Sequence, residues 1–194
     1  MPYTPPHTWV NGEIPGETVM NQEVRDNTIF ALNGKQIVQK RYTGAANYTL
    51  TGAGGTSWAD VDGTNLSLAV ASSFITQRLR CKAVFWAAIN YTDAGATPPY
   101  KGYFDLMVDG ATFLSTLTGT SNYGSAMVST GAGAPVPIAT INIPQLITIE
   151  GLFTGLTANA VHTVKLRWKI DHAQAQLIVY NNTEPPVFMM IEEP

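Results

Sequence analysis

The feature that most constrains this fold is the strict alternation within residues 162–171, HTVKLRWKID. Every second position is apolar, and the positions between carry hydroxyl or basic side chains; the apolar residues are Val164, Leu166, Trp168 and Ile170. Because successive side chains of a β-strand point to opposite faces, the pattern predicts a strand with one buried face and one wet, basic face.

Comparable runs of β-branched and aromatic residues recur along most of the chain. Gly, Asn, Asp and Pro separate them about every 8 to 15 residues, which is typical of an antiparallel sandwich or jelly roll. We therefore expect a mainly β fold with a turn at Asp109-Gly110. The further strands are expected at residues 66–71, 78–91, 102–109, 111–117, 146–153, 175–180 and 187–191.

The strand at residues 78–91, RLRCKAVFWAAINY, changes character along its length. Its first half alternates, whereas its second half is apolar on both faces at Val84, Phe85, Trp86 and Ala87. A strand that is wet at one end and apolar on both faces at the other is expected to run into a subunit interface.

Composition also favours an assembly. Charged residues make up 13% of the chain, against about 25% in ordinary soluble domains. With few charges to keep copies apart and 45% hydrophobic residues, part of the surface is expected to be covered by other copies or partners. The longer Gly-, Ser- and Pro-rich stretch at residues 121–137 predicts an exposed connection, where binding surfaces often lie.

Several classes of partner are not favoured. The net charge is −3, and the basic residues form no cluster larger than the pair Lys40-Arg41 and the trio Arg78, Arg80 and Lys82. Nucleic acid is therefore not an expected partner. No apolar stretch approaches 18 residues, so no membrane insertion is expected. Without a secretory signal, we expect the product to be soluble where it is made.

The first 34 residues differ from the rest. A Pro-rich arm at residues 1–7 precedes a turn-rich lead-in and a helix expected from Thr18, as N-cap, to Asn33-Gly34. Such a helix is not stable alone, so it packs either on the β domain or on copies or a larger assembly. We divide the chain into an arm and docking helix (1–34), connecting strands and a Gly-rich joint (35–55), and a sandwich domain (56–194).

Candidate chemistry is sparse. Residues 60–65 place carboxylates at alternate positions, as calcium loops do, but lack the Gly at the sixth place and the Glu at the twelfth; a turn before the next strand is favoured. His162 and His172 lie about 30 Å apart along one strand, too far to share a metal. Cys81 is the single cysteine and suits a small core position.

No motif of nucleophilic, phosphate-loop or zinc-hydrolase chemistry occurs, so we expect no catalytic residue, no metal and no cofactor. Two carboxylates from distant parts of the chain could still meet for glycoside cleavage. The enzyme class is nevertheless not the favoured one.

The start of the chain carries Thr8-Trp9 and Gly12-Glu13, followed by Met20-Asn21 and Val24-Arg25-Asp26-Asn27. This pattern resembles virion proteins of tailed bacteriophages, in which a T-W-x-x-G-E turn precedes a helix reading M-N-x-x-V-R-D-N. The resemblance covers about 25 residues and implies an attachment or assembly role for this segment. The residues assigned to docking on this basis are Trp9, Gly12, Glu13, Met20, Asn21, Val24, Arg25, Asp26 and Asn27.

The remainder is similar to the C1q/TNF-like jelly rolls of phage fibres and capsids. The likeness is carried by residues 58–62, 65–67, 153–156, 162–167 and 188–193. It implies a homotrimer. Because receptor- or sugar-binding residues of such domains lie in variable loops, none is carried over to this chain.

Together, these resemblances imply a non-enzymatic structural protein on a tailed-phage virion, made in the bacterial host cytoplasm. A tail- or baseplate-associated fibre that contacts a host receptor or polysaccharide is favoured. A capsid decoration protein or head fibre that clamps neighbouring capsid subunits is the alternative, and a sugar-binding lectin-like module is a minor one. The sequence does not decide between tail and capsid.

Overall fold

The computed structural model describes residues 37–52, 57–71, 77–91, 100–117, 124–129, 144–158, 160–173, 175–181 and 186–193. The arm, the helix and the nine docking residues expected within residues 1–34 lie outside these ranges. Within the described part, the chain is mainly antiparallel β, as predicted, with one short helix.

The first six-stranded sheet, sheet A, is built around the long strand β5. One edge of β5 pairs with β9, and the other edge pairs first with β12 and then with β11. β1 pairs with β12, and β2 pairs with β11. The bounds are β1 (Ile37–Tyr42), β2 (Tyr48–Thr51), β5 (Arg78–Tyr91), β9 (Gln145–Thr154), β11 (Ala175–Tyr180) and β12 (Val187–Glu192).

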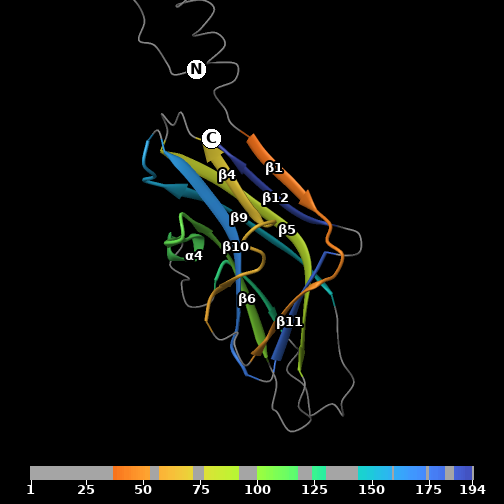
Figure 1. The fold of residues 1–194 in the computed structure, drawn as a ribbon. Coiled ribbons are helices and arrows are strands. Elements are labelled where there is room, and N and C mark those ends of the chain that lie inside the picture. The colour runs from red at the N-terminus through yellow and green to blue at the C-terminus, as the bar shows by residue number, and fades with distance from the viewer. Residues whose placement is uncertain are drawn as a thin grey trace, which may run out of the picture.

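The second six-stranded sheet, sheet B, has β10 and β6 at its centre. β4 and β3 follow each other along the free edge of β10, and β7 and β8 along that of β6. The bounds are β3 (Ala59–Asp60), β4 (Ser67–Ala71), β6 (Lys101–Val108), β7 (Thr112–Phe113), the helix α4 (Leu114–Leu117), β8 (Ala126–Ser129) and β10 (Val161–Ile170). The two sheets pack face to face as a jelly-roll sandwich (Figure 1).

The core lies between the sheets and confirms the alternation predicted for β10. Its four alternating apolar side chains are at most 4% exposed and belong to the same core cluster as the buried residues of β5. Across the core, the rings of Phe85 and Phe104 meet edge to face with their centroids 4.8 Å apart.

The opposite face of β10 is less wet than predicted. The carboxylate of Asp60 lies 3.0 Å from Lys165 Nζ and 3.0 Å from Arg167 Nε. The ammonium of Lys169 lies over the rings of Trp58 and Tyr103. These partners come from β6 and from the stretch around β3, so the local pattern of β10 could not reveal them.

Most strand positions agree with the sequence-based expectations, and the Asp109-Gly110 turn is confirmed, with φ of 53° and 71° at its two residues. The expected strand at 111–117 is wrong beyond β7, because the chain turns into α4, where the Ser115 backbone and hydroxyl donate to Asp105. The expected connection at 121–137 contains β8.

The strands at residues 35–55, expected to connect the helix to the sandwich, are themselves part of sheet A. Their inward side chains pack against the main core, which explains their position; these are Val38, Tyr42, Tyr48 and Leu50. β1 and β2 therefore belong to the sandwich, although they precede the Gly-rich joint.

Candidate assembly surface

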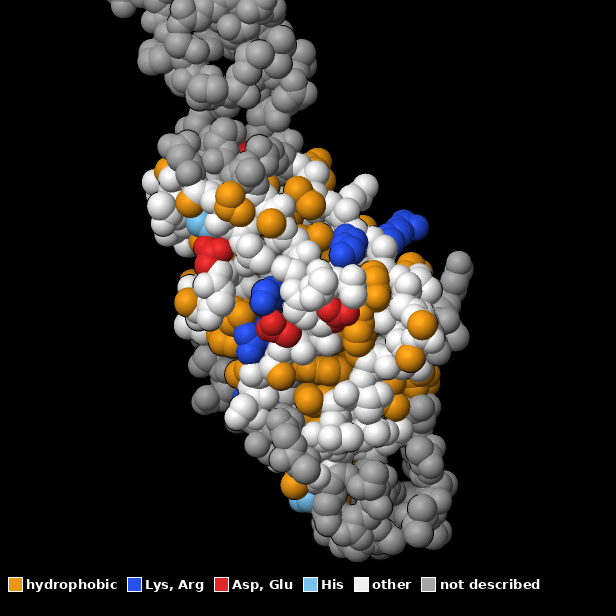
Figure 2. Space-filling view, in the orientation of Figure 1, with side chains coloured by type: hydrophobic (Ala, Val, Ile, Leu, Met, Phe, Trp, Pro, Cys, Tyr) orange, Lys and Arg blue, Asp and Glu red, His pale blue; other side chains and the backbone are white. Residues whose placement is uncertain are grey.

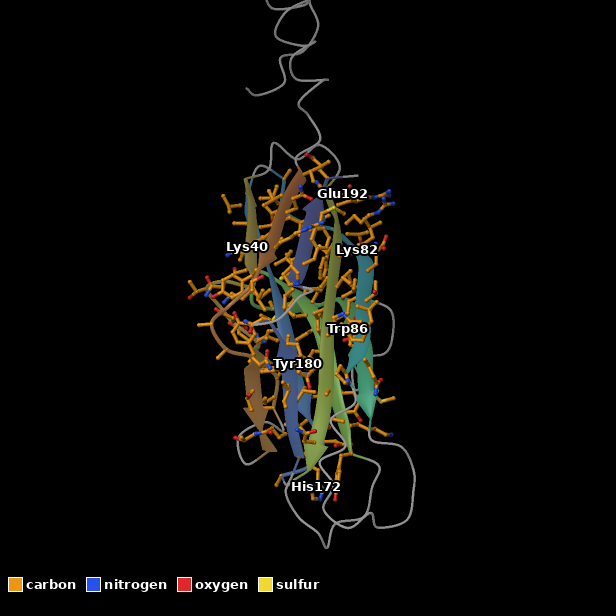
Figure 3. All side chains as sticks on the ribbon, turned by 90° about the vertical axis from the view of Figure 1, so that its right-hand side faces the viewer. Lys40, Lys82, Trp86, His172, Tyr180 and Glu192 are labelled. Atoms are coloured by element: carbon orange, nitrogen blue, oxygen red, sulfur yellow. The ribbon has the colours of Figure 1, made fainter. Side chains whose placement is uncertain are left out.

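The outer face of sheet A carries a contiguous group of apolar side chains, here called the apolar belt. Register places Trp86 between Leu146 of β9 and Tyr180 of β11, and Val84 next to Phe188 of β12. The belt consists of Val84, Trp86, Leu146, Ile178, Tyr180 and Phe188. Figure 3 looks onto this sheet, with Trp86 and Tyr180 near the middle of its length.

The belt exists because β5 is apolar on both faces in its second half, as predicted from the sequence. Phe85 and Ala87 point into the core and are 1% and 0% exposed. Val84 and Trp86 point outward and remain partly exposed. An outward strand face in an antiparallel sandwich is normally polar, so this face is unusual.

The belt is not flat. A hollow of about 300 Å³ opens within it, lined by Arg41, Val84, Phe85, Leu146, Pro186 and Phe188. Leu146 is 54% exposed at its margin, and the guanidinium of Arg41 lies 5.9 Å from the centre of the Phe188 ring. An apolar or aromatic side chain of a partner could fill this hollow and contact the Arg41 guanidinium.

Charged side chains lie beside the belt, toward the end of the sheet where β12 ends. Arg80 pairs with Glu192 at 2.9 Å, and Lys82 pairs with Glu150 at 3.3 Å (Lys82 and Glu192 are labelled in Figure 3). Such exposed pairs contribute little stability, but they leave little net charge beside the belt. On the side shown in Figure 2, acidic and basic side chains likewise lie next to one another.

The calcium-like segment at residues 60–65 folds as the predicted turn. Asp62 accepts hydrogen bonds from the backbone of Thr64 (2.9 Å) and Asn65 (2.8 Å), and from the hydroxyl of Tyr48 (2.5 Å). Burial alone would raise the pKa of Asp62, but these hydrogen bonds and that from the Asn65 amide outweigh it and lower the pKa to about 2. The carboxylate thus links the turn to β2 of the other sheet.

Asp105 is a buried carboxylate that the sequence did not single out. It is 0% exposed and accepts hydrogen bonds from the Ser115 hydroxyl, the Ser125 hydroxyl (2.7 Å) and the Leu106 backbone (2.8 Å). Burial raises the pKa of Asp105, and the hydrogen bonds oppose that rise. Because its partners come from three segments, Asp105 fastens α4 and the start of β8 to β6.

The other candidates are placed as follows. Cys81 lies in the core, as predicted, and burial raises the pKa of its thiol. His162 belongs to β10 and His172 follows its far end, so the structure does not bring them together. Within the described ranges, no group of three or more His, Cys, Asp or Glu side chains is placed to hold a metal ion.

The short helix α4 is too small to cross a membrane, and the described part of the chain contains no helix that is both long and apolar enough to do so.

The nine docking residues of the N-terminal segment lie outside the described ranges. The apolar belt is the candidate functional site of the described part.

Comparison with known proteins gives architectural similarity alone. No family model matches the chain, and no curated protein is significantly similar to it. Among solved structures, similarity is found to the infectious bursal disease virus Gx strain (9% identity, TM-score 0.33), the VP2 subviral particle of the same virus (10%, 0.33) and its T=1 particles (7%, 0.35).

These alignments cover 81%, 83% and 83% of this chain, and 37%, 38% and 36% of the viral chains, respectively. This chain thus spans less than two-fifths of each of those proteins. A similarity of this size does not assign a function to the chain.

Proposed function

We propose that this protein is a non-enzymatic structural component of a virus particle, and that it assembles as a homotrimer through the apolar belt. The observation that carries the proposal is the belt itself. Soluble monomers rarely expose contiguous apolar patches of large size, and such patches mark interaction surfaces. The proposed occupant is a second copy of the chain, because the low charge content of 13% gives copies little mutual repulsion.

The placement in a virion rests on the N-terminal resemblance to tailed-phage virion proteins. The non-enzymatic part is supported by the engagement of the described acidic groups in structural contacts. Asp60 pairs with two cations, Asp62 caps a turn, Asp105 joins three segments, and Asp109 contacts His162. Asp60, Asp62 and Asp105 are thus already engaged in contacts that hold the fold together.

Within the particle, we favour a tail- or baseplate-associated fibre whose loops contact the host surface. A capsid decoration protein is the alternative, favoured by the Pro-rich arm at residues 1–7, which suits a clamp on neighbouring subunits. Imaging of particles that carry a tag after Pro194 separates the two. Label on the tail supports the fibre, and label on the head alone excludes it.

The assembly itself is tested by the solution mass. Light scattering of the full chain should give about three times 20.9 kDa, and a mass of one chain would contradict the proposal. Phe188→Glu places a charge in the belt and should shift the mass toward one chain, since burying an aromatic side chain contributes about 1.5 to 3 kcal/mol. Gln39→Glu adds the same charge to the same sheet face outside the belt and should leave the mass unchanged.

A further inference from the structure

His162 occupies an unusual position for a titratable side chain. It lies near the start of β10, on the core-facing side of the strand, and is 3% exposed. The neighbouring strand β4 places Val70 opposite it. A buried histidine at such a position must have its ring nitrogens satisfied by nearby groups.

Both ring nitrogens of His162 face oxygen acceptors. Nδ1 lies 2.6 Å from Oδ2 of Asp109, and Nε2 lies 2.9 Å from the backbone carbonyl oxygen of Thr157. A neutral imidazole has one N–H and can donate to one of these oxygens, whereas an imidazolium donates to both. The geometry therefore selects the doubly protonated ring.

The two contacts of the His162 ring, with Asp109 and with Thr157, differ in how the partner segment is otherwise held. The carboxylate of Asp109 also accepts from the Thr163 backbone at 2.8 Å, and the Asp109 backbone donates to the Thr163 carbonyl at 2.9 Å. The turn that carries Asp109 is thus fastened to β10 without the ring. Residues 155–158 are held by the Thr157 carbonyl, which meets the ring, and at Leu156, whose N–H donates to the Gln77 carbonyl and whose side chain packs against the core.

We propose that His162 is a proton-dependent latch, which holds residues 155–158 against the sandwich while both ring nitrogens are protonated and releases them when one proton leaves. The remaining proton stays on Nδ1, where the Asp109 carboxylate is the stronger acceptor. The Nε2 lone pair then faces the lone pairs of the Thr157 carbonyl, and the contact becomes repulsive.

The direction of the pH dependence follows from the surroundings. Asp109 faces His162 with a carboxylate, β4 places an apolar residue opposite it, and the 155–158 segment presents a carbonyl. Burial by itself lowers the pKa of His162, but the hydrogen bonds to Asp109 and Thr157 raise it, and its net position is above the ordinary value of 6.5. The latch is closed below that value and opens as the pH rises through the raised pKa.

The latch lies at the end of the sandwich from which β1 starts. Leu156 donates its N–H to the carbonyl of Gln77, at 3.1 Å, immediately before β5. The same end of sheet A pairs Arg80 with Glu192 and Glu192 with Ile37. Protonation of one buried ring thus controls a segment near the start of β1.

The Leu156 amide reports on the latch through hydrogen exchange. In the full-length protein, exchange of the peptide that contains residues 155–158 is measured from pH 6 to 9.5 by mass spectrometry and corrected for the intrinsic pH dependence of exchange. Protection should fall on the order of tenfold across the His162 titration, as expected for loss of one charge-assisted hydrogen bond. Constant protection over this range would overturn the proposal.

Three variants make the result specific. His162→Gln should show low protection at every pH, and Asp109→Asn should move the release to lower pH by removing the carboxylate. His172→Gln removes a histidine at the far end of β10 and should behave as the unmodified protein. A pH-dependent loss of protection that persists in His162→Gln would overturn the proposal. If His162→Gln does not fold, Asp109→Asn is the deciding variant, and an unchanged release pH in that variant would overturn the proposal.

Discussion

Replacement of Asp62 by Asn tests how strongly one carboxylate joins the two sheets. A fall of the Asp62 pKa from 3.8 to about 2 corresponds to about 2.5 kcal/mol of stability, since one pKa unit is about 1.4 kcal/mol. Because the pKa is lowered on folding, this contribution is complete above the ordinary value and disappears as the pH falls toward 2. Asp62→Asn should therefore lose about 2.5 kcal/mol at pH 7 and only about 0.8 kcal/mol at pH 2.5.

The assay is urea unfolding followed by tryptophan fluorescence at pH 7, 4 and 2.5, at one fixed protein concentration. The difference between the unmodified protein and the variant isolates Asp62 from the other titrating groups. Thr64→Ala serves as the matched control: it changes the same turn but keeps the backbone N–H that donates to Asp62, so its cost should stay within about 0.5 kcal/mol. An equal loss for Asp62→Asn at pH 7 and pH 2.5 would refute the reasoning.

Three further predictions concern the interior. Gly124→Ala should lower the free energy of unfolding in urea by at least about 1 kcal/mol more than Gly110→Ala does. Both glycines have positive φ, but an added Cβ at Gly124 would lie 2.6 Å from the Phe104 carbonyl oxygen, whereas a Cβ at Gly110 would meet open space. Equal costs would contradict this. The thiol of Cys81 should react with a thiol reagent in urea but not in the native protein, because burial raises its pKa; rapid native labelling would place it outside the core. Asp105→Ala should lower the free energy of unfolding by about 3 kcal/mol, since it leaves several buried donors without an acceptor, and a loss below about 1 kcal/mol would show that water replaces the carboxylate.

The apolar belt could be predicted from the sequence only in part. The run from Val84 to Ala87 predicted a strand segment that is apolar on both faces, and the structure confirms it. The other contributors, such as Tyr180 and Phe188, lie in the apolar runs of β11 and β12, which the sequence analysis assigned only as strands. They join the belt because β11 and β12 pair with β5 in one particular register.

The sequence determined the features that depend on neighbours along the chain. Alternation with period two follows from the geometry of a single strand, so β10 could be predicted with its buried face. The Asp109-Gly110 turn was likewise predictable, because Asp and Gly tolerate positive φ locally. The turn before β4 was identified from the Asp- and Asn-rich segment for the same reason.

Tertiary structure alone decided the contacts that join distant segments. The Tyr48–Asp62 bond, the cluster of serines on Asp105 and the two acceptors on His162 link residues that strand pairing brings together. The same pairing moved β1 and β2 into the sandwich and gave the basic face of β10 its partners. A local pattern records which side of a strand is apolar, but which strand becomes its neighbour depends on how both sheets bury their apolar faces together.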